Sequence, residues 1–353
     1  MSQSVGEDRP APRGGSSRRA YIQRAAEIGI SLLFLVLALQ GINLQALGAA
    51  LQQANYIWLL PAIAITLGIL VVKGVRWQLL FLPDHHLAFA PVFTALCAGY
   101  LASNVLPARL GEVVRVVLLV SEEPVGVART ASTIVVERLL DVLSVMIILI
   151  LLLPFVTLPP VITRAAQTLG LSALVGAAVL LLLSHWKERV LSWTRSVLHH
   201  IPILDRPGIY RALGHLIDGF AALRGRLGLA VLALSLLSWF GSVAVAWCVG
   251  QAFAMSVPVS AMAFAVVVVA LGMVVPSSPG YIGVFHYLAS VALAPFGVPK
   301  DVALSFALVW HALNYIELSV VGLVALAIHG TSLGQVMRRW RERGKLTATQ
   351  GAK

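Results

Sequence analysis

Three charged residues at regular spacing lie just behind a proline in otherwise apolar sequence. Arg109, Glu112 and Arg115 follow one another three residues apart, and Asn104 and Pro107 precede them. A charge near the centre of a bilayer costs roughly 2.5–3.5 kcal/mol on insertion scales, and a proline removes a backbone donor that lipid cannot replace. This stretch is therefore predicted to lie either outside the membrane or inside it, shielded by protein and lining a cavity.

The same three charges suit the recognition of an anion. Proline is favoured in the first turn of a helix, so a half-helix is expected to begin near Ala108. Glu112 could pair with Arg109 or Arg115, which leaves one guanidinium in excess. A spare guanidinium beside a helix N-terminus favours the phosphate of a lipid or of a polyprenyl carrier. The alternative interpretation is a basic turn at the interface, with side chains that reach towards water.

Glu137, Arg138 and Asp141 form a second charged group, within the apolar sequence IVVERLLDVLSVMIILI. Glu137 and Asp141 share one helical face, and Arg138 points to a neighbouring face. Buried carboxylates need partners. They could bind the protons or cations that drive transport, or they could lock this helix to the preceding stretch through Arg109 or Arg115.

A second stretch is also broken by prolines and glycines, and polar residues follow it. Its members are Pro276, Pro279, Gly280, Gly283 and His286. Further on, His311, Asn314 and Glu317 recur every three residues and predict a narrow polar stripe that faces the protein interior. Metal binding by His286 and His311 is an alternative that their wide separation in the sequence disfavours. We expect no metal and no other cofactor.

The elements that must position these residues are membrane-spanning helices. The chain has 353 residues, of which 59% are hydrophobic and only 12% charged, whereas soluble domains have about 25% charged residues. The net charge of +11 gathers beside apolar spans, as the positive-inside rule predicts, and does not indicate a nucleic-acid partner. Lys73, Arg76 and Trp77 end one such span in a pattern typical of the membrane interface.

Polar stretches define one membrane domain with two tails. Residues 1–24 are predicted to be a disordered basic tail, and residues 331–353 a basic C-terminal tail. The membrane domain, 25–330, divides into halves of about 25–155 and 165–330.

The distribution of charge predicts the topology. The two tails and the basic loop 185–226 are expected in the cytoplasm, and the chargeless loops 43–56 and 251–258 outside. Six full crossings satisfy this map: 28–44, 57–80, 133–153, 169–184, 227–250 and 302–328. The remaining apolar regions, 87–121 and 259–298, must each enter and leave on one side, as re-entrant hairpins or as paired short crossings.

The two hairpins also resemble each other. PARLG at 107–111 aligns with PGYIG at 279–283, and PVGV at 124–127 aligns with PFGV at 295–298. Each half then has an odd number of crossings, so the halves form an inverted repeat. Interrupted segments at matching positions of inverted halves mark the substrate site in transporters. Coincidence is the alternative, because the chain holds 17 prolines and 29 glycines.

Three motifs, in this order, resemble the flippase-like membrane family, also called the lysylphosphatidylglycerol synthase transmembrane region. They are N-x-x-P-x-R-x-G-E-x-x-R (Asn104 to Arg115), E-R-x-x-D (Glu137 to Asp141) and P-x-S-P-G-x-x-G-x-F (Pro276 to Phe285). The resemblance covers about residues 25–330 and implies a lipid-translocating fold with re-entrant elements. In the multiple peptide resistance factor, such a domain moves aminoacylated phosphatidylglycerol across the bacterial plasma membrane.

The sequence departs from that relative in one respect and from the family pattern at two positions. It ends at Lys353, without room for a cytosolic aminoacyl transferase domain, so synthase activity is not implied. His286 stands where the family commonly has an acidic residue, and His311 where an arginine is common. We therefore do not expect the lysyl-lipid substrate to carry over.

The sequence predicts an all-α, multi-pass lipid flippase or transporter-like protein of the bacterial inner membrane, with both termini cytoplasmic, that is not an enzyme. Its partners would be the bilayer and an anionic lipid or lipid-linked headgroup, with a homo-oligomer as an open alternative. The predicted substrate-binding residues are Asn104, Arg109, Glu112, Arg115, Glu137, Arg138, Asp141, Pro279, Gly280, Gly283, His286, His311 and Asn314. The alternative function is an intramembrane enzyme, or an accessory subunit of lipid or glycan assembly, that binds a polyprenyl phosphate.

Overall fold

A computed structural model describes residues 15–106, 110–156, 225–273 and 279–332, with isolated positions elsewhere. Every regular element in these ranges is a helix, which agrees with the predicted all-α fold. Most of the predicted crossing 169–184, of the loop 185–226 and of the C-terminal tail lies outside the described residues.

Among the described residues, three helices are long and apolar enough to cross a membrane. They are α3 (Leu59–Leu79), which continues the short helix η1 (Tyr56–Trp58), α10 (Gly225–Ala252) and α13 (Lys300–Ile328). A fourth span results if α1 (Gly15–Leu39) and α2 (Leu44–Gln53), bent by 85°, are counted together. These helices overlap four of the six predicted crossings.

The helix α6 (Val127–Leu152) covers the predicted crossing 133–153. It has the length of a span, but charged residues interrupt its apolar sequence, and two of them, Arg129 and Glu137, are buried. Burial of charge in so apolar a helix requires partners from its neighbours. The packing of α6 is therefore tied to those partners.

Both Pro/Gly-broken regions form pairs of short helices. Region 87–121 contains α4 (Phe89–Val105) and α5 (Gly111–Glu122). Region 259–298 contains α11 (Val259–Gly272), η2 (Pro279–Tyr281), α12 (Val284–Leu293) and η3 (Ala294–Phe296). None of these helices reaches the roughly 20 residues that a full crossing needs.

The structure differs from the sequence prediction near the N-terminus. The stretch 1–24 is predicted to be a disordered tail, yet α1 begins at Gly15, and residues 1–14 lie outside the described residues. The predicted loop 43–56 is largely helical, as α2. The side chain of Asn43 accepts hydrogen bonds from two backbone N–H groups at 2.9 and 3.3 Å, and this cap starts the helix.

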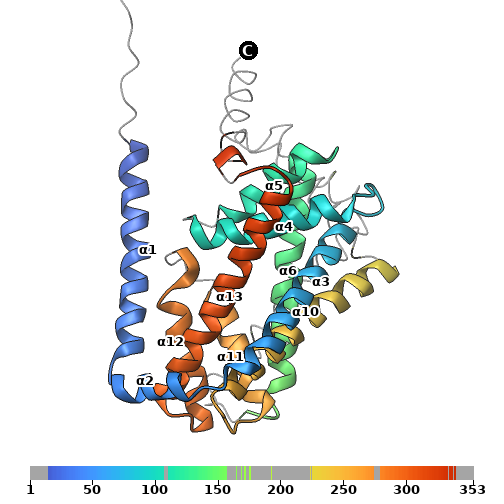
Figure 1. Ribbon diagram of the computed structural model, residues 1–353. Coiled ribbons are helices and arrows are strands. Elements are labelled where there is room, and N and C mark those ends of the chain that lie inside the picture. Colours follow the sequence, from blue (N-terminus) through green and yellow to red (C-terminus); the bar gives the residue numbers. More distant parts are fainter. Residues whose placement is uncertain are drawn as a thin grey trace, which may run out of the picture.

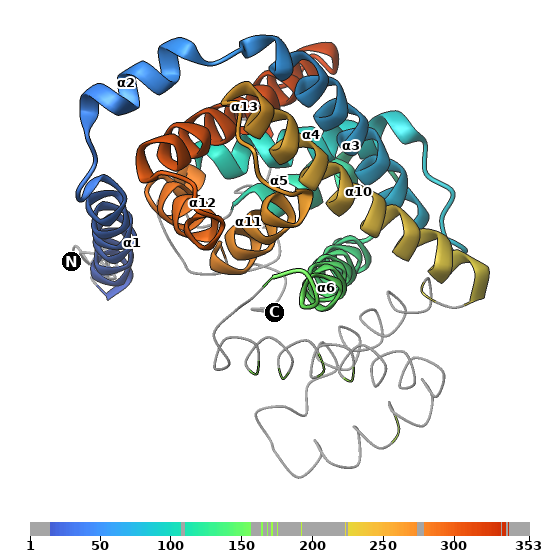
Figure 2. The same cartoon turned by 90° about the horizontal axis from the view of Figure 1, so that it is seen from below.

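The helices form one bundle with α1 at its edge. Figure 1 shows α13 passing beside α12 and α4, with α2 leading from α1 across one end of the bundle. Seen from below, α1 lies outside the group formed by the other helices (Figure 2). Its main neighbour is α12, where the rings of Phe34 and Tyr287 are 5.3 Å apart.

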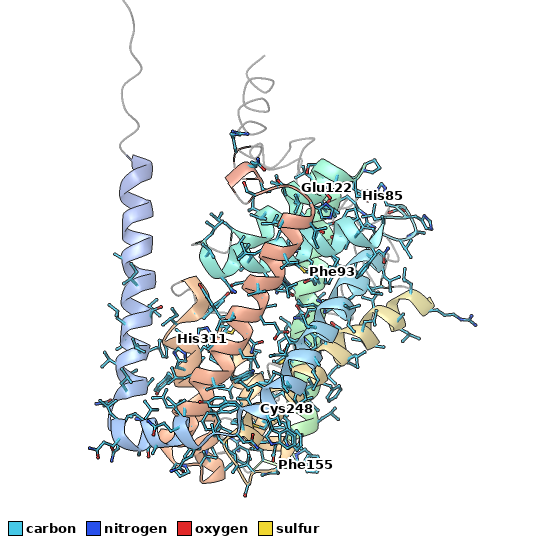
Figure 3. The ribbon with its side chains drawn as sticks, viewed as in Figure 1. His85, Phe93, Glu122, Phe155, Cys248 and His311 are labelled. Atoms are coloured by element: carbon cyan, nitrogen blue, oxygen red, sulfur yellow. The ribbon has the colours of Figure 1, made fainter. Side chains whose placement is uncertain are left out.

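The described loops gather at two opposite ends. His85 and Glu122 lie at one end and Phe155 at the other (Figure 3). The connections that follow α2 and α10 meet each other, because the backbone N–H of Asn55 donates to the carbonyl of Ala252 at 2.8 Å. The two chargeless loops, predicted to lie on the same side of the membrane, are thus at the same end of the bundle.

Candidate substrate-binding site

Glu137 is the centre of a buried ionic cluster and is completely shielded from solvent. Arg115 donates to both of its carboxylate oxygens, at 3.1 and 2.7 Å. Arg76 from α3 lies 3.3 Å from Oε1, and Arg138 donates to the same oxygen at 2.7 Å. One carboxylate therefore joins α3, α5 and α6.

Asp141, one turn further along α6, extends the cluster towards α10. Its Oδ1 accepts from Nη1 of Arg76 at 2.7 Å and from the indole N–H of Trp239 at 3.3 Å. Arg76 also donates to the hydroxyl of Ser235 at 2.5 Å. The helical spacing of Glu137 and Asp141 lets one arginine reach both carboxylates.

Arg115 is held from both sides. Its guanidinium carbon lies 4.0 Å from the centre of the Trp77 ring, whose N–H donates to the hydroxyl of Thr133 at 3.0 Å. On the other side, a Cβ placed on Gly99 would lie 2.2 Å from Cγ of Arg115. Any other residue at position 99 would collide with the side chain of Arg115. The close approach of α4 therefore helps to orient this arginine on α5.

The accessible cation of the cluster is Arg138. Its side chain is 48% exposed, whereas those of Arg76 and Arg115 are 0% and 4% exposed. Glu112, itself 47% exposed, approaches Arg138 only to 3.8 Å. The three arginines exceed Glu137 and Asp141 by one positive charge, and the half-exposed Glu112 balances it through this long contact on the solvent side of Arg138.

The structure therefore revises the roles predicted for the arginines. Arg115 serves as the ionic lock to α6, one of the two alternatives for the second charged group. Arg109 lies outside the described residues. Arg76 and Trp77, which fit an interface pattern in the sequence, have fully buried side chains, so they contact the protein interior and not lipid headgroups. The sequence did contain a signal for the role of Arg76. Glu137 and Asp141 lie in an apolar helix and need cationic partners, and Arg76 is an arginine in another apolar span.

A second polar group joins the two broken regions. The side-chain amide of Asn104, at the end of α4, donates to the carbonyl of Tyr315 at 3.1 Å and to the hydroxyl of Ser319 at 3.0 Å. The Tyr315 hydroxyl donates back to the carbonyl of Asn104 at 3.3 Å. A Cβ on Gly280 would lie 2.8 Å from the Tyr315 ring. The first broken region thus meets the second across α13.

His286 and His311, far apart in the sequence, are in direct contact. Nε2 of His286 lies 3.1 Å from Nδ1 of His311, and Nε2 of His311 lies 2.7 Å from the carbonyl of Gly280. Nδ1 of His286 accepts from the backbone N–H of Gly283 at 3.3 Å. A carbonyl only accepts and an N–H only donates, so this chain is satisfied when both rings are neutral.

Glycines and aromatic packing hold the histidine pair in place. Gly280 and Gly283 have φ of +71° and +87°, a backbone region that other residues rarely adopt. The ring of Phe285 stacks on His311 at 4.8 Å. The side chain of the remaining predicted residue of α13, Asn314, donates to the carbonyl of Trp310 in its own helix at 2.8 Å.

The described residues contain no group of three or more His, Cys, Asp or Glu side chains that could hold a metal ion. Pro279 begins η2, but its side chain lies outside the described part of the chain. Apart from Asn314, the predicted residues whose side chains are described divide between the ionic cluster around Glu137 and the junction between Asn104 and His286.

Apolar spans and short apolar helices define a multi-pass helical membrane protein. A sequence profile described as the lysylphosphatidylglycerol synthase TM region matches residues 24–322. The protein belongs to this family, and the resemblance predicted from three motifs is confirmed. No curated protein and no solved structure matches the chain significantly. Family membership makes it a membrane protein related to lipid metabolism or translocation.

Proposed function

We propose that the protein translocates an anionic phospholipid, or a lipid-linked phosphate headgroup, across the bacterial inner membrane. It does so without a catalytic step and with both termini in the cytoplasm. The observation that carries this proposal is the half-exposed guanidinium of Arg138, which lies beside two buried arginines and meets the half-exposed Glu112 only at 3.8 Å. A guanidinium can bind a phosphate strongly, through paired hydrogen bonds.

The buried part of the cluster fixes the position of Arg138. Glu137 and Asp141 lie within 2.7 and 3.6 Å of its guanidinium nitrogens, and they are themselves held by Arg76 and Arg115. The residue that binds the headgroup in this proposal is therefore Arg138, and Arg115 acts as its support. Glu112 would release Arg138 when phosphate arrives, because their contact is long and exposed to solvent.

The junction of the two broken regions supports a transport cycle. Broken helices at the centre of a bundle supply polar groups where an intact apolar helix could not. Asn104 and Tyr315 connect the end of α4 to α13 by hydrogen bonds. Breaking and reforming these contacts would let α4 and α5 move against α12 and α13 while the headgroup passes.

The test is translocation by the purified protein in liposomes that contain fluorescent phosphatidylglycerol, with dithionite quenching as the readout. We expect faster movement of phosphatidylglycerol than of labelled phosphatidylcholine, because the second headgroup carries its own cation. Heat-denatured protein is the control. Conversion of a polyprenyl phosphate to product without lipid movement would contradict the proposal and favour an intramembrane enzyme.

A further inference from the structure

A buried carboxylate on α13 has no partner in the described structure. Glu317 is 8% exposed, and both of its side-chain oxygens are fully covered without a hydrogen bond. It forms no ion pair with the described residues. In the ionic cluster around Glu137, arginines surround the buried carboxylates and balance their charge. Glu317 is different, and an ionised carboxylate is very unfavourable in such a place.

A polar group close to Glu317 is the hydroxyl of Thr66 on α3. This hydroxyl donates its single proton to the carbonyl of Ala62 at 3.0 Å. It can therefore only accept a hydrogen bond from Glu317, and an ionised carboxylate has none to donate. A carboxylic acid would complete a chain from Glu317 through Thr66 to Ala62.

The described residues around Glu317 supply no counter-charge. Exposed apolar side chains occupy nearby positions of the two helices, at Leu67 next to Thr66 in α3 and at Ile316 and Val320 in α13. The titratable groups on the helices that pack against α13 are Lys73 and Arg76 (α3), Cys97 and Tyr100 (α4), His286 and Tyr287 (α12), and Arg226 and Cys248 (α10).

The nearby basic groups in this set are engaged elsewhere. The ammonium of Lys73 lies 5.5 Å from the centre of the Tyr100 ring. Arg76 binds the carboxylates of α6, and His286 contacts His311. A carboxyl group without a cation, in an apolar setting, is suited to binding a proton.

We propose that Glu317 is a proton-binding site that couples proton movement to lipid movement. In the described state its carboxyl group has taken one proton from water and is uncharged, and a small movement would bring its O–H within hydrogen-bond distance of the Thr66 hydroxyl. When α3 and α13 separate enough to admit water, the proton returns to water and the carboxylate becomes hydrated. The coupling rests on the proposed transport function, whereas proton binding at Glu317 does not.

Infrared spectroscopy of the protein in lipid nanodiscs tests proton binding directly. The wild-type protein should show a carboxylic acid C=O band at neutral pH that Glu317→Gln lacks and that Glu317→Asp retains. The matched control Glu123→Gln, at the end of α5, should keep the band. A wild-type spectrum without this difference band, or a band that responds to sodium rather than to pH, would overturn the proposal.

Translocation of labelled phosphatidylglycerol under an imposed pH gradient tests the coupling. The wild-type rate should depend on the direction of the gradient, and in Glu317→Gln the ratio of the two rates should fall to about one. A gradient dependence that survives in Glu317→Gln would refute the coupling. If the wild-type protein moves no lipid at all, the transport function and the coupling both fail, and the infrared band alone decides whether Glu317 binds a proton.

Discussion

Glu137 is the residue on which the ionic cluster depends, because three arginines share its two carboxylate oxygens. Its replacement by glutamine keeps the shape but leaves Arg76 and Arg115 as buried charges with too few counter-charges. Removal of one partner from a buried ion pair costs about 3–5 kcal/mol. We expect Glu137→Gln to lower the free energy of unfolding by about this amount, measured by thermal unfolding in detergent.

A double variant separates the ionic effect from packing. Arg115→Met in the Glu137→Gln background removes the stranded charge and retains an apolar chain of similar length, so it should restore part of the lost stability. The control variant Glu123→Gln, at a half-buried position outside the ionic cluster, should change stability by no more than about 0.5 kcal/mol. An equal loss in the single and the double variant would show that the charge of Arg115 is not what Glu137 balances.

At the scale of the elements, the first broken region depends on the close crossing of α4 and α5. A Cβ on Gly111 would lie 2.2 Å from the carbonyl oxygen of Gly99 and 2.0 Å from the hydroxyl of Ser103. We expect Gly111→Ala to push the helices apart and to lower the unfolding free energy by about 1–3 kcal/mol. The comparison is again thermal unfolding.

Gly68 is the matched control, because it also lies in a helix but a Cβ added to it would meet no atom within 4 Å. Alanine there should stabilise the protein by about 0.5–1 kcal/mol, since glycine is unfavourable inside a helix. If both alanine variants were equally stable, the close approach of α4 and α5 would not be a constraint.

The sequence predicted both broken regions and the carboxylates of α6, because prolines, glycines and charges stand out in apolar sequence. It also offered Arg115 as a partner for Glu137. The role of Arg76 could not be predicted, since only the packing of α3 against α6 distinguishes a buried arginine from one at the interface. The contact between His286 and His311 likewise depends on how α12 folds back on α13.

At the scale of the whole molecule, the two ends of the bundle should face opposite sides of the membrane. Ala49 is exposed in α2 and Ser256 is exposed in the loop after α10, two elements whose ends are hydrogen bonded to each other. Glu123 directly follows Glu122, which lies at the end of the bundle opposite Phe155 (Figure 3). Introduced cysteines at Ala49 and Ser256 should react with an impermeant maleimide on intact spheroplasts. A cysteine at Glu123 should react only after permeabilisation.

The labelling experiment has a built-in control, because the natural cysteines, Cys97 and Cys248, are both buried. The wild-type protein should therefore give little background. Labelling of Ala49→Cys and Ser256→Cys from opposite sides would contradict the arrangement of the bundle, in which the loops next to them are hydrogen bonded to each other.

The most direct test of the proposed function is translocation of labelled phosphatidylglycerol by variants of Arg138. Arg138→Gln should slow translocation by about tenfold or more, because a hydrogen bond to a charged group contributes about 1.5–3 kcal/mol. Arg138→Lys should recover part of the rate, and Arg226→Gln, at the exposed start of α10, should leave it unchanged. A folded Arg138→Gln protein that moves phosphatidylglycerol at the wild-type rate would contradict the claim that this guanidinium binds the headgroup.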